Sequence, residues 1–401
     1  MSRLLSFAVF FGVLTLLTGL VHAYFWSRLV RAPGWPAPWQ AVGTAAVVVL
    51  ALLVPVAVPV SRLLPREWAG GVSAVAFTWM GLGFLLFVAL VLADLVAWAG
   101  PALLATATAA KGEVAADPAR RELLARGVAG AATLAAAGMG GVALRNAVGS
   151  PAVTEVEVRL ERLPPALSGL TLVQLSDVHV GPTIGRRFIE DLVERTNALQ
   201  PDVVVITGDL VDGSVGELAH HVEPLRQLRA RHGVYFVTGN HEYYSGAEEW
   251  VAHLPTLGVR VLRNERVAIG DERGWIDLAG VNDYKAGSFG DAPDLERALA
   301  GRDPARELVL LAHQPAEIEN AARLGVGLQL SGHTHGGQIW PFGNAVRLAQ
   351  PYVSGLHRHG PQTQIYVSCG TGYWGPPMRL GAPSEITKIV LRPAAHADVA
   401  A

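Results

Sequence analysis

The stretch GHTHGG, residues 332–337, places His333 and His335 two residues apart between glycines. Side chains two apart on extended backbone project to the same side, so these imidazoles can bind one metal ion or two adjacent ones. The apolar run GLQL, residues 327–330, predicts a short buried strand directly before them. Both histidines then lie on the loop at its C-terminal end, where α/β sheets hold their ligands. Taken alone, the pair is equally compatible with a structural role.

Four other short apolar runs upstream are followed by metal-capable side chains in the same way. They are Asp177 and His179 after 172–175, Asp209 and Asp212 after 203–206, Asn240, His241 and Glu242 after 234–237, and His313 after 308–311. Five clusters in one structural position, rich in Asp, Asn and His, make coincidence improbable. None uses cysteine, and the single Cys369 excludes an intramolecular disulfide and a cysteine-based zinc site.

This order of motifs resembles the calcineurin-like metallophosphoesterase family, and most of all its bacterial membrane-anchored branch. The resemblance covers about Val156 to Leu391. It implies two facing sheets flanked by helices, a four-layer αββα sandwich, with the metals at the strand ends. Strands that alternate with helices along this region independently indicate a layered α/β domain.

The resemblance also implies a role for each motif residue. One metal would be bound by Asp177, His179 and His335, the other by Asn240, His313 and His333, and Asp209 would bridge them. His241 would stabilise or protonate the leaving oxygen, and Glu242 would orient it, with Asp212 a weaker candidate for the same support. Carboxylate, imidazole and amide ligands without thiolates suit Mn, Fe, Zn or Co and do not choose among them.

Side chains downstream of the ligand motifs are candidates for holding the substrate. His357, His359 and Arg379 lie in loop regions where they would contact a phosphate or a headgroup. The apolar stretch Ile339 to Phe342 follows GHTHGG directly. It is either part of the core or a surface that meets a lipid tail.

The chain as a whole is too apolar for an ordinary soluble protein. Over all 401 residues, 51% are hydrophobic and the mean hydropathy is +0.32. Long apolar runs predict transmembrane helices at about 4–26, 40–60, 72–98 and 127–144. The organisation expected is a membrane domain over 1–149, a metallophosphoesterase domain over 150–393 and a disordered tail over 394–401.

The positions of basic residues predict the sidedness of the membrane domain. The first and third connectors hold six Lys and Arg residues, against two in the second connector plus Arg3. This bias puts the first and third connectors in the cytoplasm and, with four spans, the catalytic domain outside it. Arg120-Arg121 resembles a twin-arginine export signal, or is plain positive-inside charge. If the fourth, Ala- and Gly-rich segment does not span, the sidedness reverses.

These observations predict an integral-membrane enzyme, a metal-dependent phosphoric ester hydrolase. A hydroxide held between two metals would attack a phosphodiester or a pyrophosphate, with a lipid or a nucleotide-sugar lipid among the substrates considered. The alternative is a non-catalytic membrane sensor or scaffold that binds a phosphorylated ligand. The formal charge of −2 and the lack of a basic stripe exclude a nucleic-acid partner. The bilayer and a phosphoester are the partners expected, and no obligate protein partner is inferred.

Overall fold

The computed structural model describes residues 3–64, 66–107 and 118–394. The chain folds into two compact units, Met1–Leu144 with Gly375–Pro377, and Arg145–Trp374 with Met378–Ala401. The disordered tail predicted over 394–401 lies outside the described residues except for Ala394.

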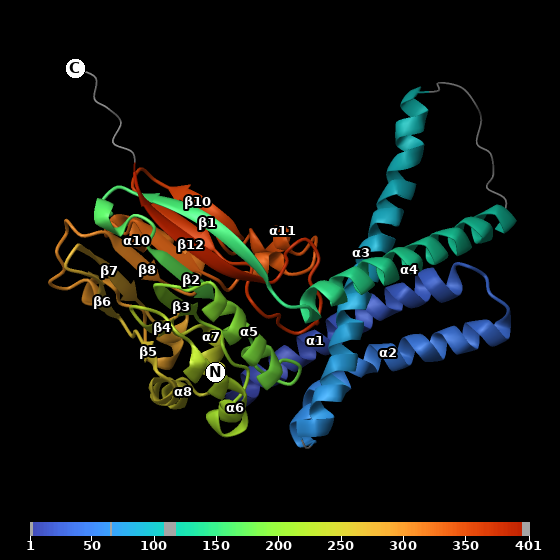
Figure 1. Ribbon diagram of the computed structural model, residues 1–401. Helices are drawn as coiled ribbons and strands as arrows, with labels where there is room; N and C mark the ends of the chain where they lie inside the picture. The colour runs from blue at the N-terminus through green and yellow to red at the C-terminus, as the bar shows by residue number, and fades with distance from the viewer. Residues whose placement is uncertain (1–2, 65, 108–117, 395–401) are drawn as a thin grey trace. The chain divides into compact units, whose positions relative to one another are not determined.

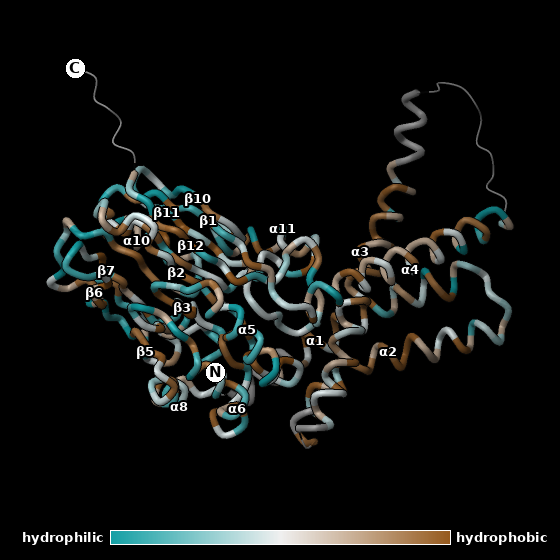
Figure 2. Tube along the Cα trace, in the orientation of Figure 1, coloured by the Kyte–Doolittle hydropathy of each residue, from teal (hydrophilic) through white to brown (hydrophobic). Residues whose placement is uncertain are grey.

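The first unit consists of long apolar helices (Figure 2). They are α1 (Arg3–Phe25), continued by the π-helical turn η1 (Trp26–Arg31), then α2 (Ala37–Leu63), α3 (Arg66–Ala107) and α4 (Pro118–Val148), which runs into the second unit. Within the described residues, four helical segments are long and apolar enough to cross a membrane: Phe11–Arg31, Ala37–Val60, Trp68–Ala99 and Pro118–Val148. The predicted N-terminal spanning helices are therefore present, and the fourth is longer than the sequence pattern predicts.

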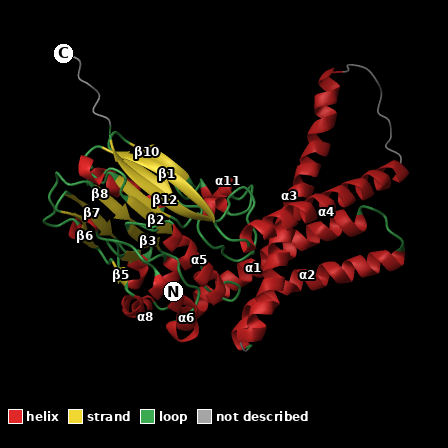
Figure 3. Ribbon diagram, viewed as in Figure 1, coloured by secondary structure: helices red, strands yellow, loops and turns green. Residues whose placement is uncertain are grey.

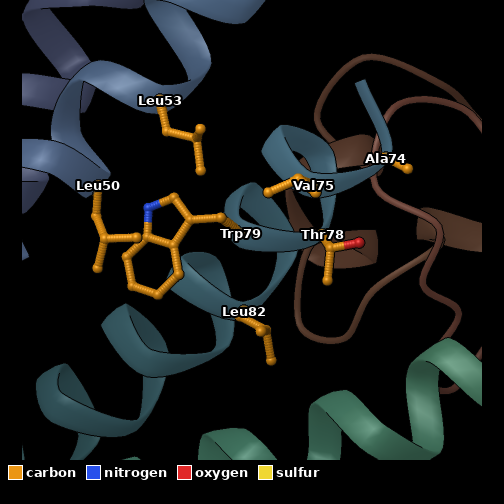
Figure 4. Close-up of a pocket in the computed structure, with 7 residues that line it drawn as sticks. All are labelled: Leu50, Leu53, Ala74, Val75, Thr78, Trp79 and Leu82. Carbon is orange, nitrogen blue, oxygen red and sulfur yellow. The ribbon is translucent and has the colours of Figure 1, made fainter. Parts of the chain in front are cut away.

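Polar contacts in this unit join the C-terminal end of the first span and the turn after it to the helices α3 and α4. Arg28 forms an ion pair with Asp94 of α3, and the hydroxyl of Tyr24 donates to the same carboxylate at 2.7 Å. Arg126 of α4 donates through Nε to the carbonyl of Pro33 at 2.8 Å. Elsewhere in the unit, a shallow hollow of about 380 Å³ between α2 and α3 is lined almost entirely by apolar side chains around Trp79 (Figure 4).

The second unit contains two six-stranded sheets among the residues described (Figure 3). The first sheet is built from β1 (Ala152–Leu160), β2 (Thr171–Leu175), β3 (Val203–Thr207), β4 (Val234–Val237), β5 (Val259–Val261) and β12 (Glu385–Pro393), in the order β1-β12-β2-β3-β4-β5. The second is built from β6 (Glu265–Asp271), β7 (Gly274–Gly280), β8 (Leu308–Leu311), β9 (Leu328–Ser331), β10 (Gly355–His359) and β11 (Thr363–Val367), in the order β10-β11-β9-β8-β7-β6. Strands β2 to β5 pair in parallel, as do β7, β8, β9 and β11.

Three apolar cores separate the layers of this unit (Figure 1). The central core joins both sheets, with Val205 of β3 and Leu330 of β9 among its buried members. A second core packs the other face of the first sheet against α5 (Arg186–Ala198), α6 (Val215–Val222) and α8 (Ala247–His253). A third packs the second sheet against α9 (Leu295–Ala298) and α10 (Ile318–Arg323). The predicted four-layer αββα sandwich is therefore confirmed.

The helix between β3 and β4 is shorter than the sequence pattern predicts. The pattern favours one helix over 217–231, whereas α6 ends at Val222 and a 3-10 turn, η3 (Glu223–Gln227), follows it. Pro224 has no backbone N–H and clashes with the preceding turn, so it cannot continue the α-helix. The remaining short helices are α7 (Asn240–Ser245) and α11 (Gly343–Val346).

Candidate metal centre

The candidate ligands lie in loops that begin where parallel strands end. Asp177 follows β2, Asp209 follows β3 and His333 follows β9, so the strands bring them to one edge of the two sheets. Their backbone is unusual. Among the described residues, eight non-glycine positions have positive φ, and five of them are candidate ligands: Asp177, His179, Asp209, His333 and His335. Such conformations cost free energy and cluster at functional sites.

Two glycines allow these loops to approach one another. A Cβ on Gly332 would lie 2.0 Å from Oγ of Ser176 and 2.2 Å from Oδ2 of Asp177. A Cβ on Gly239 would lie 2.2 Å from Oδ1 of Asp209. Any side chain at either position would push a candidate ligand away, so the close approach requires glycine.

One group of candidate ligands consists of Asp177, His179 and His335, all buried. Nε2 of His179 lies 3.1 Å from Nε2 of His335, and the latter lies 3.5 Å from Oδ1 of Asp177. Burial, His179 and Arg379 lower the pKa of His335 well below its usual range, which favours the neutral imidazole. Two imidazole nitrogens that face each other at this distance fit ligands of one metal ion.

A second group consists of Asp209, His313 and His333. Nδ1 of His313 is 2.8 Å from the carbonyl oxygen of Thr207 and donates to it, which leaves the lone pair on Nε2. That Nε2 lies 3.1 Å from Oδ2 of Asp209. Burial lowers the pKa of His313, but Asp209 and Asp177 outweigh burial and raise it well above the usual range. A positive charge, either a proton or a metal ion, is therefore favoured between His313 and Asp209.

Unsatisfied buried atoms indicate that this centre is built for cations. Among the described residues, Oδ1 of Asn240 and Nε2 of His313 are buried with no hydrogen-bond partner. Burying a polar atom without a partner costs about 1 to 3 kcal/mol, and a metal ion would satisfy both atoms. Together with the carboxylate and imidazole donors of the two groups, these atoms fit two divalent cations. The structure thus brings together six of the seven predicted ligand residues, in two groups that Asp209 links.

His241 points its ring towards the same centre and is held by Asp212. Nδ1 of His241 lies 2.6 Å from Oδ1 of Asp212, and Nε2 lies 4.0 Å from Oδ2 of Asp209. The same Asp212 oxygen accepts from Nδ1 of His179 at 3.1 Å. These three residues also lie close enough to hold a metal, but both Nδ1 atoms are used as donors to Asp212, so we assign them a hydrogen-bonded role. Burial lowers the pKa of His241, whereas Asp209 and Asp212 outweigh burial and raise it to about 9.

The contacts of Glu242 differ from the sequence-based hypothesis, in which this residue orients His241. Its buried carboxylate accepts from the backbone N–H of Gly239 at 2.7 Å, Leu210 at 2.8 Å and Asp209 at 3.0 Å. Burial and Asp209 raise the pKa of Glu242 to about 7, and these amides oppose that shift. Glu242 therefore holds the loops of Asp209 and Asn240 against each other. Because Asp212 lies 29 residues from His241, its hydrogen bond was only a secondary possibility from sequence.

We expect Glu242→Gln to lower the stability of the α/β unit by about 2 to 4 kcal/mol, because an amide cannot accept all the backbone bonds and leaves buried donors unpaired. Thermal unfolding of the purified chain should show a Tm lower by roughly 5 to 15 °C. Glu249→Gln, at an exposed position of α8, is the matched control and should leave the Tm unchanged. Equal Tm values for the two variants would contradict the role given to Glu242.

Arg379, predicted to contact the substrate, is instead buried and bonded to backbone carbonyls. Arg379 is 0% exposed, and its guanidinium donates to the carbonyls of Gly372, Cys369 and Ala382 and lies 3.2 Å from Nδ1 of His335. This burial corrects the predicted substrate contact: Arg379 ties loops together behind His335.

His357 and His359 lie on β10, where both rings contact Tyr352. Nε2 of His357 lies 2.7 Å from the carbonyl oxygen of Ser354, and Nδ1 of His359 lies 3.0 Å from the Tyr352 hydroxyl. These contacts account for both rings without a substrate. No local sequence pattern predicts that Tyr352 contacts both histidines, because a single tyrosine before a strand is equally typical of the core.

Comparison with known proteins places the chain among metal-dependent phosphoesterases. Residues 170–337 match the family described as Calcineurin-like phosphoesterase. A Bos taurus protein named "Transmembrane protein with metallophosphoesterase domain" is 48% identical over 63% of this chain and 60% of its own length. An "Uncharacterized metallophosphoesterase" of Helicobacter pylori is 44% identical over 61% of this chain and 64% of its own. Another from Aquifex aeolicus is 33% identical over 60% and 91%. The chain thus spans less than two thirds of the first two relatives and most of the third.

Proposed function

The chain belongs to the calcineurin-like metallophosphoesterase family, and from this premise we propose that it is a membrane-anchored phosphoesterase that uses two metal ions. Its substrate is a phosphodiester or a pyrophosphate, and lipid and nucleotide-sugar lipid esters are the compounds to test first. The observation that supports this most is the pair of ligand groups, Asp177 with His179 and His335 and Asp209 with His313 and His333, that Asp209 links.

In this proposal Asp177, His179 and His335 hold one ion, and Asn240, His313 and His333 hold the other. Asp209 touches both groups, since its Oδ2 lies 3.1 Å from Nε2 of His313 and 3.9 Å from Nε2 of His179. When bound, the ions supply Lewis acidity at the phosphoryl group and a supply of hydroxide near neutral pH.

The proton needed by the leaving oxygen is held by His241. Its Nδ1 is fixed by Asp212, so Nε2 is the atom that faces the metal centre and can donate. Asp212 and Asp209 favour the protonated ring, which raises the pKa of His241 to about 9. Bound cations would offset part of the Asp209 charge and bring this pKa towards neutrality, where a general acid works best.

Activity is expected to depend on added metal. The purified full chain, supplied with Mn²⁺, should hydrolyse bis(p-nitrophenyl) phosphate, and removal of metal with a chelator should abolish turnover reversibly, because the ligand groups have no substitute for the cation charge. The same assay, run on phosphatidic acid, lipid pyrophosphates and nucleotide-sugar lipids, ranks substrate classes. Tight phosphate binding without turnover under any divalent metal would instead favour a sensor or scaffold.

The catalytic unit lies outside the cytoplasm in this proposal. The contact of Arg126 with Pro33 supports one side for the first and third connectors, which carry most of the basic residues. A reporter enzyme that is active only outside the cytoplasm, fused after Ala401, should therefore be active. Activity only for a cytoplasmic reporter at the same position would reverse the assignment.

A further inference from the structure

Exposed aromatic side chains of the α/β unit concentrate in the segments that follow the carboxyl ends of its strands. Among its described residues, seven aromatic side chains are exposed, and six follow the carboxyl ends of β4, β7, β9 or β11: Tyr244, Tyr284, Phe289, Trp340, Phe342 and Trp374. The seventh, Trp275, lies within β7. The loops that present the aromatic rings thus follow parallel strands of the same two sheets that position the ligands.

Three of these side chains, Trp374, Tyr244 and Phe289, form a continuous line of ring contacts with His241, the aromatic row. The ring centroids of Trp374 and Tyr244 both lie 5.4 Å from that of His241, and Phe289 lies 6.2 Å from Tyr244. The side chains of the row are 53%, 63% and 46% exposed for Trp374, Tyr244 and Phe289. His241, the residue proposed to act on the leaving oxygen, therefore stands between exposed rings.

The row is held in place by polar contacts behind it. The side chain of Gln338 accepts from the backbone N–H of Trp374 at 3.0 Å and donates to its carbonyl at 2.9 Å. On the other side, the ring of Tyr243 packs on Phe289 at 5.3 Å, and its hydroxyl donates to Asp291 at 2.7 Å. Asp291 is in turn paired with Arg263. These contacts fix the backbone of Trp374 and pack Phe289 against a held neighbour, which reduces the ordering that a bound ligand would require.

The geometry of the row favours a hydrocarbon over a flat base. The planes of neighbouring rings meet at 74°, 69° and 56°, so no two consecutive rings are parallel and none form a slot for a nucleobase. Trp374 and Tyr244 both contact His241, so their exposed apolar surface lies beside the proposed acid and can bury a ligand there. The same polypeptide carries four membrane-length helices among its described residues, which tether this unit where lipid phosphoesters are concentrated.

We propose that Trp374, Tyr244 and Phe289 bind the hydrocarbon part of a lipid phosphoester whose phosphate reaches the candidate metal centre. This inference rests on the proposed function for the place of the phosphate and adds the class of its apolar substituent. The rings of the row surround His241, which is proposed to protonate the leaving oxygen. The hydrocarbon therefore belongs to the leaving group. A phosphoester without an apolar leaving group would leave these rings in water.

Binding of alkylphosphonates tests the aromatic row without turnover, because their C–P bond is not hydrolysed. Titration calorimetry on the Mn²⁺-loaded full chain in detergent, with a protein-free titration subtracted, gives Kd values for methyl-, butyl- and octylphosphonate. Octylphosphonate should bind at least about tenfold more tightly than methylphosphonate, since each buried methylene adds affinity. In Trp374→Ala and Tyr244→Ala this ratio should fall towards one.

Trp275→Ala is the matched control, because it removes an exposed aromatic ring outside the row and should keep the ratio of the unsubstituted chain. An unchanged Tm for each variant separates loss of the subsite from loss of the fold. Equal Kd values across the alkyl series, or an undiminished ratio in Trp374→Ala, would overturn the proposal. So would a nucleoside monophosphate that binds more tightly than octylphosphonate and depends on Trp374. Selective octylphosphonate binding without hydrolysis of any ester would uphold the row and reject the proposed function.

Discussion

Replacing His241 with glutamine is expected to lower kcat by about 10² to 10⁴-fold and to leave the metal content unchanged. Glutamine can still hydrogen-bond to Asp212, but it has no proton to give to a leaving oxygen at neutral pH. The ring of His241 is held by Asp212 at 2.6 Å and is not placed among the proposed ligands. Steady-state kinetics and elemental analysis of the same preparation measure both quantities.

The identity of the leaving group sharpens this test. An alkoxide needs protonation and p-nitrophenolate does not, so the loss in His241→Gln should be much larger for an alkyl leaving group than for p-nitrophenol. His220→Gln, at an exposed position of α6, is the control and should behave like the unsubstituted chain. An equal loss for both leaving groups would remove His241 from the acid role and leave it a positioning residue.

Asp209→Asn is expected to lower kcat/KM on the order of 10³-fold, equal to about 4 kcal/mol of transition-state stabilisation, and to reduce the metal bound per chain. The carboxylate of Asp209 approaches ring nitrogens of both ligand groups, and the amide keeps its size while it removes the charge. Burial raises the pKa of Asp209, but His313 and His241 outweigh burial and hold it well below its usual range, so the charge is present at neutral pH.

The control for Asp209→Asn is Asp303→Asn, on an exposed loop, which should retain full metal content and activity. Thermal unfolding, measured once with chelator and once with Mn²⁺, tests the role of Asp209 in metal binding separately from its effect on kcat/KM. If its role is to hold cations, Mn²⁺ should raise the Tm of the unsubstituted chain more than that of Asp209→Asn. Equal metal content and equal Tm shifts would show that the charge of Asp209 is not needed for the metals.

Much of the fold was predictable because its signals are local. The long apolar runs predict the N-terminal helices, and short β-branched runs such as 203–206 predict the buried parallel strands that the structure contains. Two of the edge strands were harder to predict: β5 has three residues, and β10 includes Arg358 and two histidines, so neither has the hydrophobic pattern of a buried strand.

For the site, too, residues marked by a local motif could be predicted, and contacts between distant segments could not. His179 and His335 were recognisable because each follows a short apolar strand closely in the sequence, where ligands of α/β sheets lie. The hydrogen-bond partners within the site were not recognisable, since Glu242 binds backbone amides and Asp212 binds His179 and His241. Which oxygen meets which donor depends on the packing of separate loops. Arg379 shows the same limit, because burial is a property of the folded chain.

Local sequence is sufficient for the classes of element and for the chemistry of the donors. Strand-forming runs, apolar helices and the order of Asp, Asn and His motifs are local properties that survive without knowledge of contacts. The relations between distant segments emerge only on folding: the meeting of GHTHGG with the loops after β2 and β3, and the line of exposed rings around His241. The physical reason is that such contacts are set by sheet order and loop packing, which no local pattern encodes.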